Sequence, residues 1–185
     1  MRWLISLPSC IKSEARFCER CGTLLVVKAV EDRERPCCPS CGFVAYLDPK
    51  VAAGVIVTLD GGVVLLKRNI DPGFGKWVFP GGYVDAGEPT DVAAVRETRE
   101  EVGLEVEIGE LLGVLSYEGE RVVLIVYTGR VVGGKLEGNF ESQAVATFAP
   151  RDIPWNDLAF DTTREALQIW VAQYGEMYEK ERLLC

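Results

Sequence analysis

Histidine is absent from the 185-residue sequence, and this absence restricts the chemistry more than any other feature of the composition. Without an imidazole, neither a Ser-His-Asp triad nor a Cys-His pair can activate a nucleophile, and no metal can be bound through histidine. Acid–base work would therefore fall to carboxylates, lysine, tyrosine, cysteine or a metal-bound water.

A long hydrophobic run is also missing. No stretch approaches the ~20 apolar residues that span a membrane. The opening MRWLISLPSC has one positive charge and an apolar run too short for a signal peptide. The seven cysteines are odd in number, which without a signal peptide fits a reducing compartment better than a disulfide framework. We therefore expect a soluble, cytoplasmic protein with no membrane partner.

Positive charge is in deficit. Lysine and arginine total 20 against 28 aspartates and glutamates, which gives a net charge of −8. Because nucleic acids and anionic membranes attract clustered lysine and arginine, this balance disfavours nucleic acid as the main partner. A small anionic substrate remains compatible with it, since a bound divalent cation can reverse the local field.

The composition, 48% hydrophobic, suffices for one cored domain plus a small module. We assign residues 1–15 to an N-terminal tail without a predicted role. Residues 16–47 hold five of the seven cysteines, and residues 48–185 form the larger domain. The division follows a change of composition after the turn-like segment LDPK at 47–50.

Hydrophobic patterns predict a mixed α/β fold for the larger domain. VAAGVIVTLDGGVVLLKR at 51–68 predicts a β-hairpin that turns at Asp60-Gly61-Gly62. Helix signals begin near Pro89, with Glu88 as a cap, and end at Gly103. The remaining expected elements are strands within 104–119, 121–134 and 143–150 and an amphipathic helix over 162–179.

Two Cys-x2-Cys pairs, Cys18–Cys21 and Cys38–Cys41, are separated by 16 residues. This is the spacing of a four-cysteine zinc site, in which two tight turns each offer two thiolates to a tetrahedral metal. The alternative interpretation is four small buried hydrophobic residues or a disulfide pair. Acidic residues offset the basic ones between the pairs, so no basic stripe appears. The spacing predicts a zinc ribbon that the metal stabilises, with a structural role.

The segment RETREEVGL places Glu97, Glu100 and Glu101 at i, i+3 and i+4, so that three carboxylates share one face of a helix. Like charges at this spacing cost roughly 0.2–0.5 kcal/mol per pair. Ala93 and Ala94 are expected on the same face and would leave it open, which favours a metal site over an ordinary solvated face. Oxygen clusters of this kind suit Mg²⁺ or Mn²⁺, which would offset the repulsion.

The stretch GGYVDAGEPTDVAAVRETREEVGL resembles the Nudix box, GX5EX7REUXEEXGU with U aliphatic, from Gly82 to Leu104. The single departure is Thr98, where the pattern has an aliphatic residue. The resemblance implies a Nudix fold, with a mixed sheet sandwiched between helices, here with an N-terminal zinc ribbon. It also implies an enzyme, a Nudix pyrophosphatase that uses Mg²⁺ or Mn²⁺ to hydrolyse a nucleoside diphosphate linked to another group.

The resemblance also implies roles for single residues. The three glutamates would bind the metal or activate water, and Gly82 would contribute its carbonyl oxygen. Arg96 would orient the carboxylates, and Glu88 would support the loop–helix–loop. Glu141 lies where many relatives carry a further acid that binds metal or activates water, and a plain solvated loop acid is the alternative. Ala144 stands where a second acid is frequent, which puts a helper base from this loop in doubt.

In the family that this sequence resembles, residues outside the box determine which substrate is cleaved. NADH pyrophosphatases, one group with a ribbon ahead of a Nudix domain, carry SQPWPFP after the box, and this sequence lacks it. DPK at 48–50, Ser116-Tyr117 and AFDTTREAL at 159–167 are similar to motifs of ADP-ribose or FAD pyrophosphatases. The resemblance thus implies a small nucleotide substrate, ADP-ribose or FAD, and a homodimer, which is common among such enzymes. The alternatives are an NADH pyrophosphatase, an RNA-end hydrolase and a catalytically silent nucleotide binder.

Four aromatic residues are candidates to stack on an adenine or isoalloxazine ring of the substrate, and for each a role in the core is an equal alternative. They are Phe74, Trp77, Tyr117 and Phe160.

Overall fold

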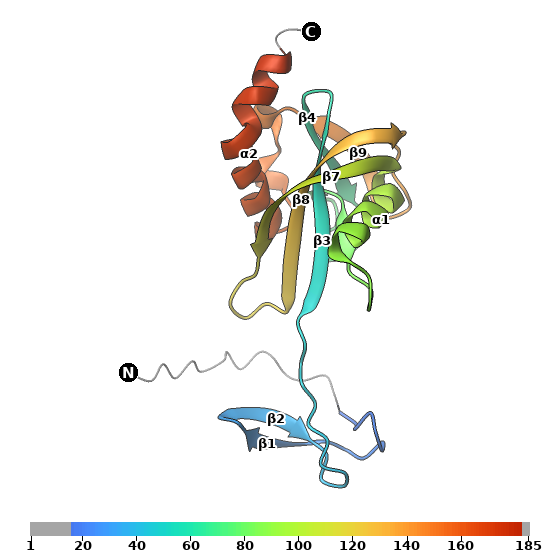
Figure 1. Cartoon of the computed structure of the whole chain (residues 1–185), viewed down its shortest axis with the longest axis vertical. Helices are drawn as coiled ribbons and strands as arrows, with labels where there is room; N and C mark the ends of the chain where they lie inside the picture. Colours follow the sequence, from blue (N-terminus) through green and yellow to red (C-terminus); the bar gives the residue numbers. More distant parts are fainter. Residues whose placement is uncertain (1–15, 183–185) are drawn as a thin grey trace, which may run out of the picture. The chain divides into compact units, whose positions relative to one another are not determined.

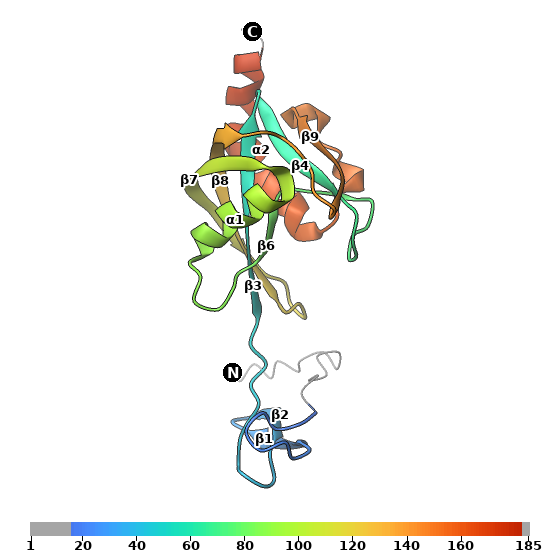
Figure 2. The same ribbon diagram turned by 90° about the vertical axis from the view of Figure 1, so that its right-hand side faces the viewer.

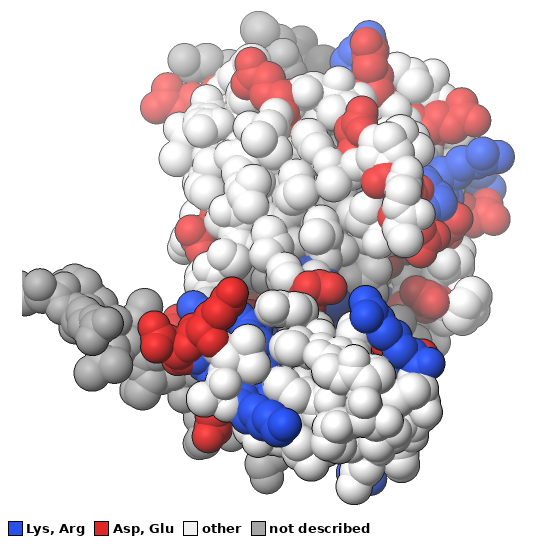
Figure 3. Space-filling view, turned by 60° about the horizontal axis from the view of Figure 1, so that its bottom comes forward, with Lys and Arg blue, Asp and Glu red and all other residues white. Residues whose placement is uncertain are grey.

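The structure, a computed structural model, describes residues 16–182. These residues divide into two compact units, which we describe separately. The smaller unit consists of residues 16–49 and 117–121, and the larger unit consists of the rest. Basic and acidic side chains are interspersed on the face shown in Figure 3, and among the described residues of that face no continuous basic area appears.

The smaller unit contains an antiparallel pair of strands, β1 (Val26–Val30) and β2 (Arg33–Cys37). The chain turns between them at Glu31 and Asp32, both of which have positive φ, as tight hairpins require. The Cys-x2-Cys segments before β1 and after β2 each end in a glycine whose amide hydrogen-bonds to the carbonyl of the first cysteine, Gly22 to Cys18 and Gly42 to Cys38.

The larger unit is built on a seven-stranded sheet (Figures 1 and 2). Five strands form its main path in the order β5-β4-β3-β8-β7, while β6 pairs with β3 and β9 pairs with β4. Only the β3–β8 pair is parallel among the described strands. The strands are β3 (Lys50–Leu59), β4 (Gly62–Arg68), β5 (Trp77–Val78), β6 (Gly81–Tyr83), β7 (Leu104–Leu115), β8 (Val122–Gly134) and β9 (Ser142–Phe148).

Two helices lie on opposite sides of this sheet, α1 (Thr90–Val102) and α2 (Asp161–Arg182) (Figures 1 and 2). The sequence of strand β3 is almost continuously apolar, because a helix covers each of its two faces. Val55 and Val57 pack on the α1 side, whereas Ile56 packs on the α2 side with Trp170. Two short 3-10 helices, η1 (Pro150–Asp152) and η2 (Trp155–Asp157), precede α2.

Most expected elements are confirmed, with small shifts at their ends. The hairpin turns at Asp60 and Gly61, and Gly62 already belongs to β4. Helix α1 ends where predicted, because Gly103 adopts φ 70° and its amide donates to the carbonyl of Arg99. At the other end Pro89, not Glu88, occupies the cap position, and no side chain caps the helix. None of the helices within the described residues is long and apolar enough to cross a membrane.

The expectation of an open helix face beside the carboxylates is wrong. Ala93 and Ala94 are fully buried, whereas Val92 is 50% exposed. The reason is that α1 lies closely on β3, β6 and β7, so this side of the helix faces the sheet. Glu101 therefore lies on the buried side of the helix with the alanines.

Candidate active site

Strand β6 brings the glycine pair of the box against the helix. Gly81 and Gly82 pair with Gly54 and Ala53 of β3. A Cβ atom added to Gly82 would lie 2.5 Å from the carboxyl carbon of Glu97, so only glycine leaves room for this carboxylate beside the strand. Gly82 and Glu97 of the box are thus brought into direct contact.

The three box glutamates of helix α1 are Glu97, Glu100 and Glu101, and Glu101 is the most enclosed of them. Its side chain is buried, and its Oε2 accepts a hydrogen bond from the amide of Gly81 at 2.8 Å. Burial, with the negative charge of Glu97 nearby, raises the pKa of Glu101 to about 8 despite this hydrogen bond. A carboxyl group whose pKa is strongly shifted by burial and by a neighbouring charge is typical of a functional site.

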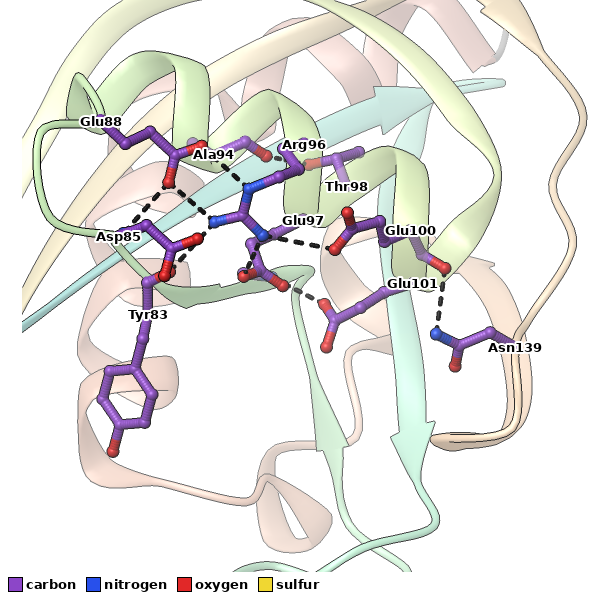
Figure 4. Close-up of polar contacts among 11 residues, drawn as sticks. Tyr83, Asp85, Glu88, Ala94, Arg96, Glu97, Thr98, Glu100, Glu101 and Asn139 are labelled. Carbon is purple, nitrogen blue, oxygen red and sulfur yellow. Dashed lines mark hydrogen bonds and ion pairs between the residues drawn. The ribbon is translucent and has the colours of Figure 1, made fainter.

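Arg96 holds the cluster together (Figure 4). Its guanidinium donates to both carboxylate oxygens of Glu88 at 2.9 Å, to Glu97 at 2.7 Å and to Glu100 at 3.3 Å. It also donates to the carbonyl of Tyr83 on β6. The bidentate bond from Arg96 lowers the pKa of Glu88 to about 2, which keeps this pair charged. Arg96 therefore fixes the loop before the helix and two of the three box glutamates at once.

The three box glutamates differ in their exposure to water. Burial raises the pKa of Glu97, and the hydrogen bond from Arg96 partly offsets this effect. The side chain of Glu100 is 57% exposed and faces water beside the guanidinium (Figure 4). The exposure of the carboxylates thus increases from Glu101, which is buried, to Glu100, which is exposed. A ligand can therefore reach the cluster from solvent.

The turn between β8 and β9 adds a fourth acid. The negative charge of Glu141 contributes to raising the pKa of both Glu97 and Glu101, so Glu141 lies near enough to act on both carboxylates. Its carbonyl accepts from the amide of Asn69 at 2.7 Å, and its amide donates to Oδ1 of Asn139 at 2.8 Å. The structure therefore brings Glu141, distant in sequence, to the three box glutamates.

These oxygens fit a hard divalent cation. Carboxylates and a backbone carbonyl are the ligands that Mg²⁺ and Mn²⁺ prefer. Arg96 supplies one positive charge against the three carboxylates that it contacts, Glu88, Glu97 and Glu100, so the cluster carries negative charge that a cation would neutralise. A pocket of about 360 Å³ opens beside Glu100, lined by the end of α1 and by residues 135–139. Another pocket of about 340 Å³, between α2 and the β7–β8 pair, contains none of the four acids.

Comparison with known proteins identifies the family. The family model described as NUDIX domain matches residues 48–169. The chain belongs to the Nudix family. A solved structure, the NUDIX hydrolase from Nitrosomonas europaea, superposes with a TM-score of 0.82 at 32% identity, covering 87% of this chain and 93% of that one. The predictions of a Nudix fold and of a Nudix pyrophosphatase are confirmed.

Two relatives of this Nudix chain carry different substrates in their names. The ADP-ribose pyrophosphatase of Methanocaldococcus jannaschii is 37% identical over 120 residues, which cover 63% of this chain and 70% of the relative. The NAD-capped RNA hydrolase NudC of Pseudomonas aeruginosa is 35% identical over 125 residues, 65% of this chain. The matched region spans only 42% of the length of that NudC.

The departure from the Nudix box at Thr98 is accommodated locally. Thr98 is fully buried on α1, and its hydroxyl donates to the carbonyl of Ala94 at 2.8 Å. The hydroxyl is therefore satisfied within the helix, and its methyl group packs as the aliphatic residue of the box would. The departure leaves the carboxylates of the Nudix helix in place.

The four aromatic candidates separate into packed and exposed residues. Trp77 on β5 packs edge-to-face on Phe148, with ring centroids 4.9 Å apart, and Phe160 lies beneath the guanidinium of Arg68. Both are part of or adjacent to the hydrophobic core. Phe74 is exposed in the loop before β5, and Tyr117 belongs to the smaller unit. Trp77 and Phe160 therefore support the core rather than offer a free ring.

Two asparagines at the Nudix site were not predicted from the sequence. Asn139 donates through Nδ2 to the carbonyl of Glu100 at 3.0 Å, and Asn69 donates to the carbonyl of Phe140 at the same distance. Together they tie the turn that carries Glu141 to α1 and to the end of β4. Such side-chain-to-backbone bonds across the fold follow no sequence period, so no pattern could have indicated them.

The predicted zinc ligands meet in the smaller unit. Their sulfur atoms lie within 4.8 Å of one another, and the closest pairs are 3.4 and 3.6 Å apart. A tetrahedral zinc with bonds of ~2.3 Å places sulfurs about 3.7 Å apart, whereas a disulfide needs about 2.05 Å. The distances fit zinc and not a disulfide. We call these four residues the cysteine quartet: Cys18, Cys21, Cys38 and Cys41.

The fifth described cysteine lies apart from the cysteine quartet. Cys37 is buried, and its thiol donates to the carbonyl of Arg35. Within the quartet, hydrogen bonding with Thr23 lowers the pKa of Cys21 to about 6, which favours the thiolate form that binds metal. Cys38, which the spacing predicts as a ligand, thus belongs to the cysteine quartet, and Cys37 does not.

Proposed function

We propose that this Nudix enzyme hydrolyses the pyrophosphate bond of a nucleoside diphosphate linked to another group, with ADP-ribose or FAD as substrate. The observation that carries the proposal is the cluster of Glu97, Glu100 and Glu101 against Gly82, held by Arg96. The relative named ADP-ribose pyrophosphatase, at 37% identity, supports this substrate class.

The cluster has the chemistry that such a reaction needs. When bound, Mg²⁺ or Mn²⁺ polarises a phosphoryl oxygen and stabilises developing negative charge. The three box glutamates and the carbonyl of Gly82 would hold it, and Glu141 would be a further ligand or the base that activates water. Because burial raises the pKa of Glu101 to about 8, this group carries a proton at neutral pH until a cation takes its place. Arg96 keeps Glu97 and Glu100 in position throughout.

The zinc ribbon forms the second part of the proposal. We propose that residues 16–47 are a structural ribbon held by Zn²⁺ on the cysteine quartet, joined to a Nudix domain of residues 48–185. The thiol distances support a metal, and free thiols support a reducing, cytoplasmic location. The homodimer implied by the resemblance stays a prediction, which the sedimentation of the purified chain checks.

A second candidate function is hydrolysis of NAD-capped RNA. The relative named NudC, at 35% identity, favours it. The net charge of −8 and the interspersed charges of the described surface in Figure 3 disfavour an RNA partner. We therefore rank a small nucleotide above a capped RNA.

Steady-state hydrolysis by the purified whole chain with Mg²⁺ or Mn²⁺ separates the candidates. The panel holds ADP-ribose, FAD, NADH, a nucleoside triphosphate and an NAD-capped oligoribonucleotide. We expect AMP release with the highest kcat/KM for ADP-ribose or FAD. A tenfold or greater lead of NADH or of the capped RNA, about 1.4 kcal/mol of discrimination, would overturn the substrate assignment. If none of the panel's compounds is hydrolysed, the protein is a catalytically silent nucleotide binder.

A further inference from the structure

One aromatic ring, in the turn that carries Glu141, is largely exposed to solvent. Phe140 is 79% exposed, the highest value among the large hydrophobic side chains that the structure describes. It directly precedes Glu141 in the turn between β8 and β9. Single exposed hydrophobic residues are common on surfaces, so exposure alone carries no function. The surroundings of this ring distinguish it.

The backbone around Phe140 is fixed from two sides. Asn69, at the end of β4, donates through its side chain to the carbonyl of Phe140 at 3.0 Å and through its amide to the carbonyl of Glu141 at 2.7 Å. Asn139 donates to the carbonyl of Glu100 on α1 and accepts from the amide of Glu141. The turn is therefore anchored to both α1 and β4, and the ring extends into solvent from a fixed backbone.

The position of this turn places the backbone of Phe140 near the carboxylate cluster. Consecutive Cα atoms are about 3.8 Å apart, so the ring leaves the chain between Glu141 and Asn139, whose side chain donates to the carbonyl of Glu100 at 3.0 Å. A diphosphate held over these carboxylates carries its nucleoside groups outward on either side. Three other aromatic residues of the larger unit offer less of a free face. Trp77 packs on Phe148, Phe160 lies beneath Arg68, and the ring of Tyr83 lies beneath the ammonium of Lys50.

We propose that Phe140 is a specificity-determining residue that stacks on a planar ring of the substrate, the nucleobase or the isoalloxazine. Aromatic faces stack on any heterocycle without reading its hydrogen-bonding edge. Phe140 thus selects for substrates that carry a ring within reach of the diphosphate, and not for one particular base. This inference rests on the proposed function, because it requires the diphosphate to lie over the carboxylate cluster.

The test compares Phe140→Ala and Phe140→Trp with Leu111→Ala, a matched truncation of an exposed hydrophobic residue on β7. The readouts are kcat and KM for whichever dinucleotide wild type cleaves, and inhibition constants for AMP, FMN and ribose 5-phosphate. AMP and FMN carry a ring, and ribose 5-phosphate does not. Melting temperatures check that all three variants fold as wild type does, which we expect since both positions are exposed.

We expect Phe140→Ala to raise KM about tenfold with little change in kcat, and to weaken AMP or FMN inhibition by a similar factor. Inhibition by ribose 5-phosphate should stay within about twofold, and both Phe140→Trp and Leu111→Ala should behave as wild type. An unchanged KM in Phe140→Ala, or equal losses for ringed and ringless inhibitors, would refute the stacking role. A wild-type protein that cleaves no dinucleotide would instead refute the proposed function, and this inference with it.

Discussion

Changing Glu101→Gln should stabilise the protein at alkaline pH when no Mg²⁺ or Mn²⁺ is present. The carboxyl of Glu101 is 7% exposed and accepts only the amide of Gly81 among the hydrogen bonds found in the described residues. Burial raises its pKa to about 8, from an ordinary value of 4.5. Glutamine keeps the shape and can still accept this bond, but it carries no charge to bury.

The direction in which the free energy of unfolding changes with pH follows from proton binding. Between pH 4.5 and about 8 the folded protein holds a proton on Glu101 that the unfolded chain has lost. The free energy of unfolding therefore falls as the pH rises through this window. A difference of one in pKa corresponds to about 1.4 kcal/mol, so the full loss above pH 8 is at most about 5 kcal/mol. A loss of a few kcal/mol is the realistic expectation, because water that reaches the carboxylate softens the effect of burial.

Urea unfolding at a series of pH values from 5 to 9 measures this loss. The buried Trp170 makes tryptophan fluorescence a reporter of the larger unit. No chelator is added, so that metal on the cysteine quartet is undisturbed. Glu100→Gln is the matched control, since its side chain is 57% exposed and it should keep the wild-type slope. Identical pH slopes for wild type and Glu101→Gln would refute the reasoning.

Three further predictions concern the supports of the site. Gly82→Ala should lower kcat on the order of 10²-fold, because the new Cβ would displace Glu97, whereas Gly113→Ala meets no atom within 4 Å and should leave kcat unchanged. Arg96→Lys should lower kcat roughly 10- to 100-fold, because an ammonium cannot replace the bidentate bond to Glu88, and wild-type kinetics would contradict this. Elemental analysis should find about one zinc per chain, and a serine substitution in the cysteine quartet should reduce it; a zinc-free, folded wild-type protein would contradict the ribbon assignment.

The sequence predicted the chemistry of the site better than its packing. Helical spacing alone brought three glutamates together, because i, i+3 and i+4 positions share a face in any helix. The buried side of α1 could not be predicted from hydrophobicity. Val92 is more apolar than Glu101, yet Val92 is exposed and Glu101 buried, because the close approach of β6 selects for small residues and for the carboxylate that Gly81 binds.

The distant parts of the site depend on tertiary contacts that leave no local pattern. Glu141 was predicted only through the family resemblance, and its approach to the cluster depends on the pairing of β9 with β4. The asparagines that fix its turn act through single side-chain bonds to the backbone. Among the aromatic residues, the sequence could not separate Trp77, which packs, from Phe140, which does not.

The central claim is that the box glutamates hold a divalent cation on which pyrophosphate hydrolysis depends. It is tested most directly by the rate of AMP release from ADP-ribose as Mg²⁺ is titrated into wild type and into Glu97→Gln, with circular dichroism to confirm that the variant is folded. We predict no wild-type turnover before the cation is added, a saturable rise with it, and a loss of turnover by orders of magnitude in Glu97→Gln. A folded Glu97→Gln with the wild-type rate, or full wild-type turnover without any divalent cation, would contradict the claim.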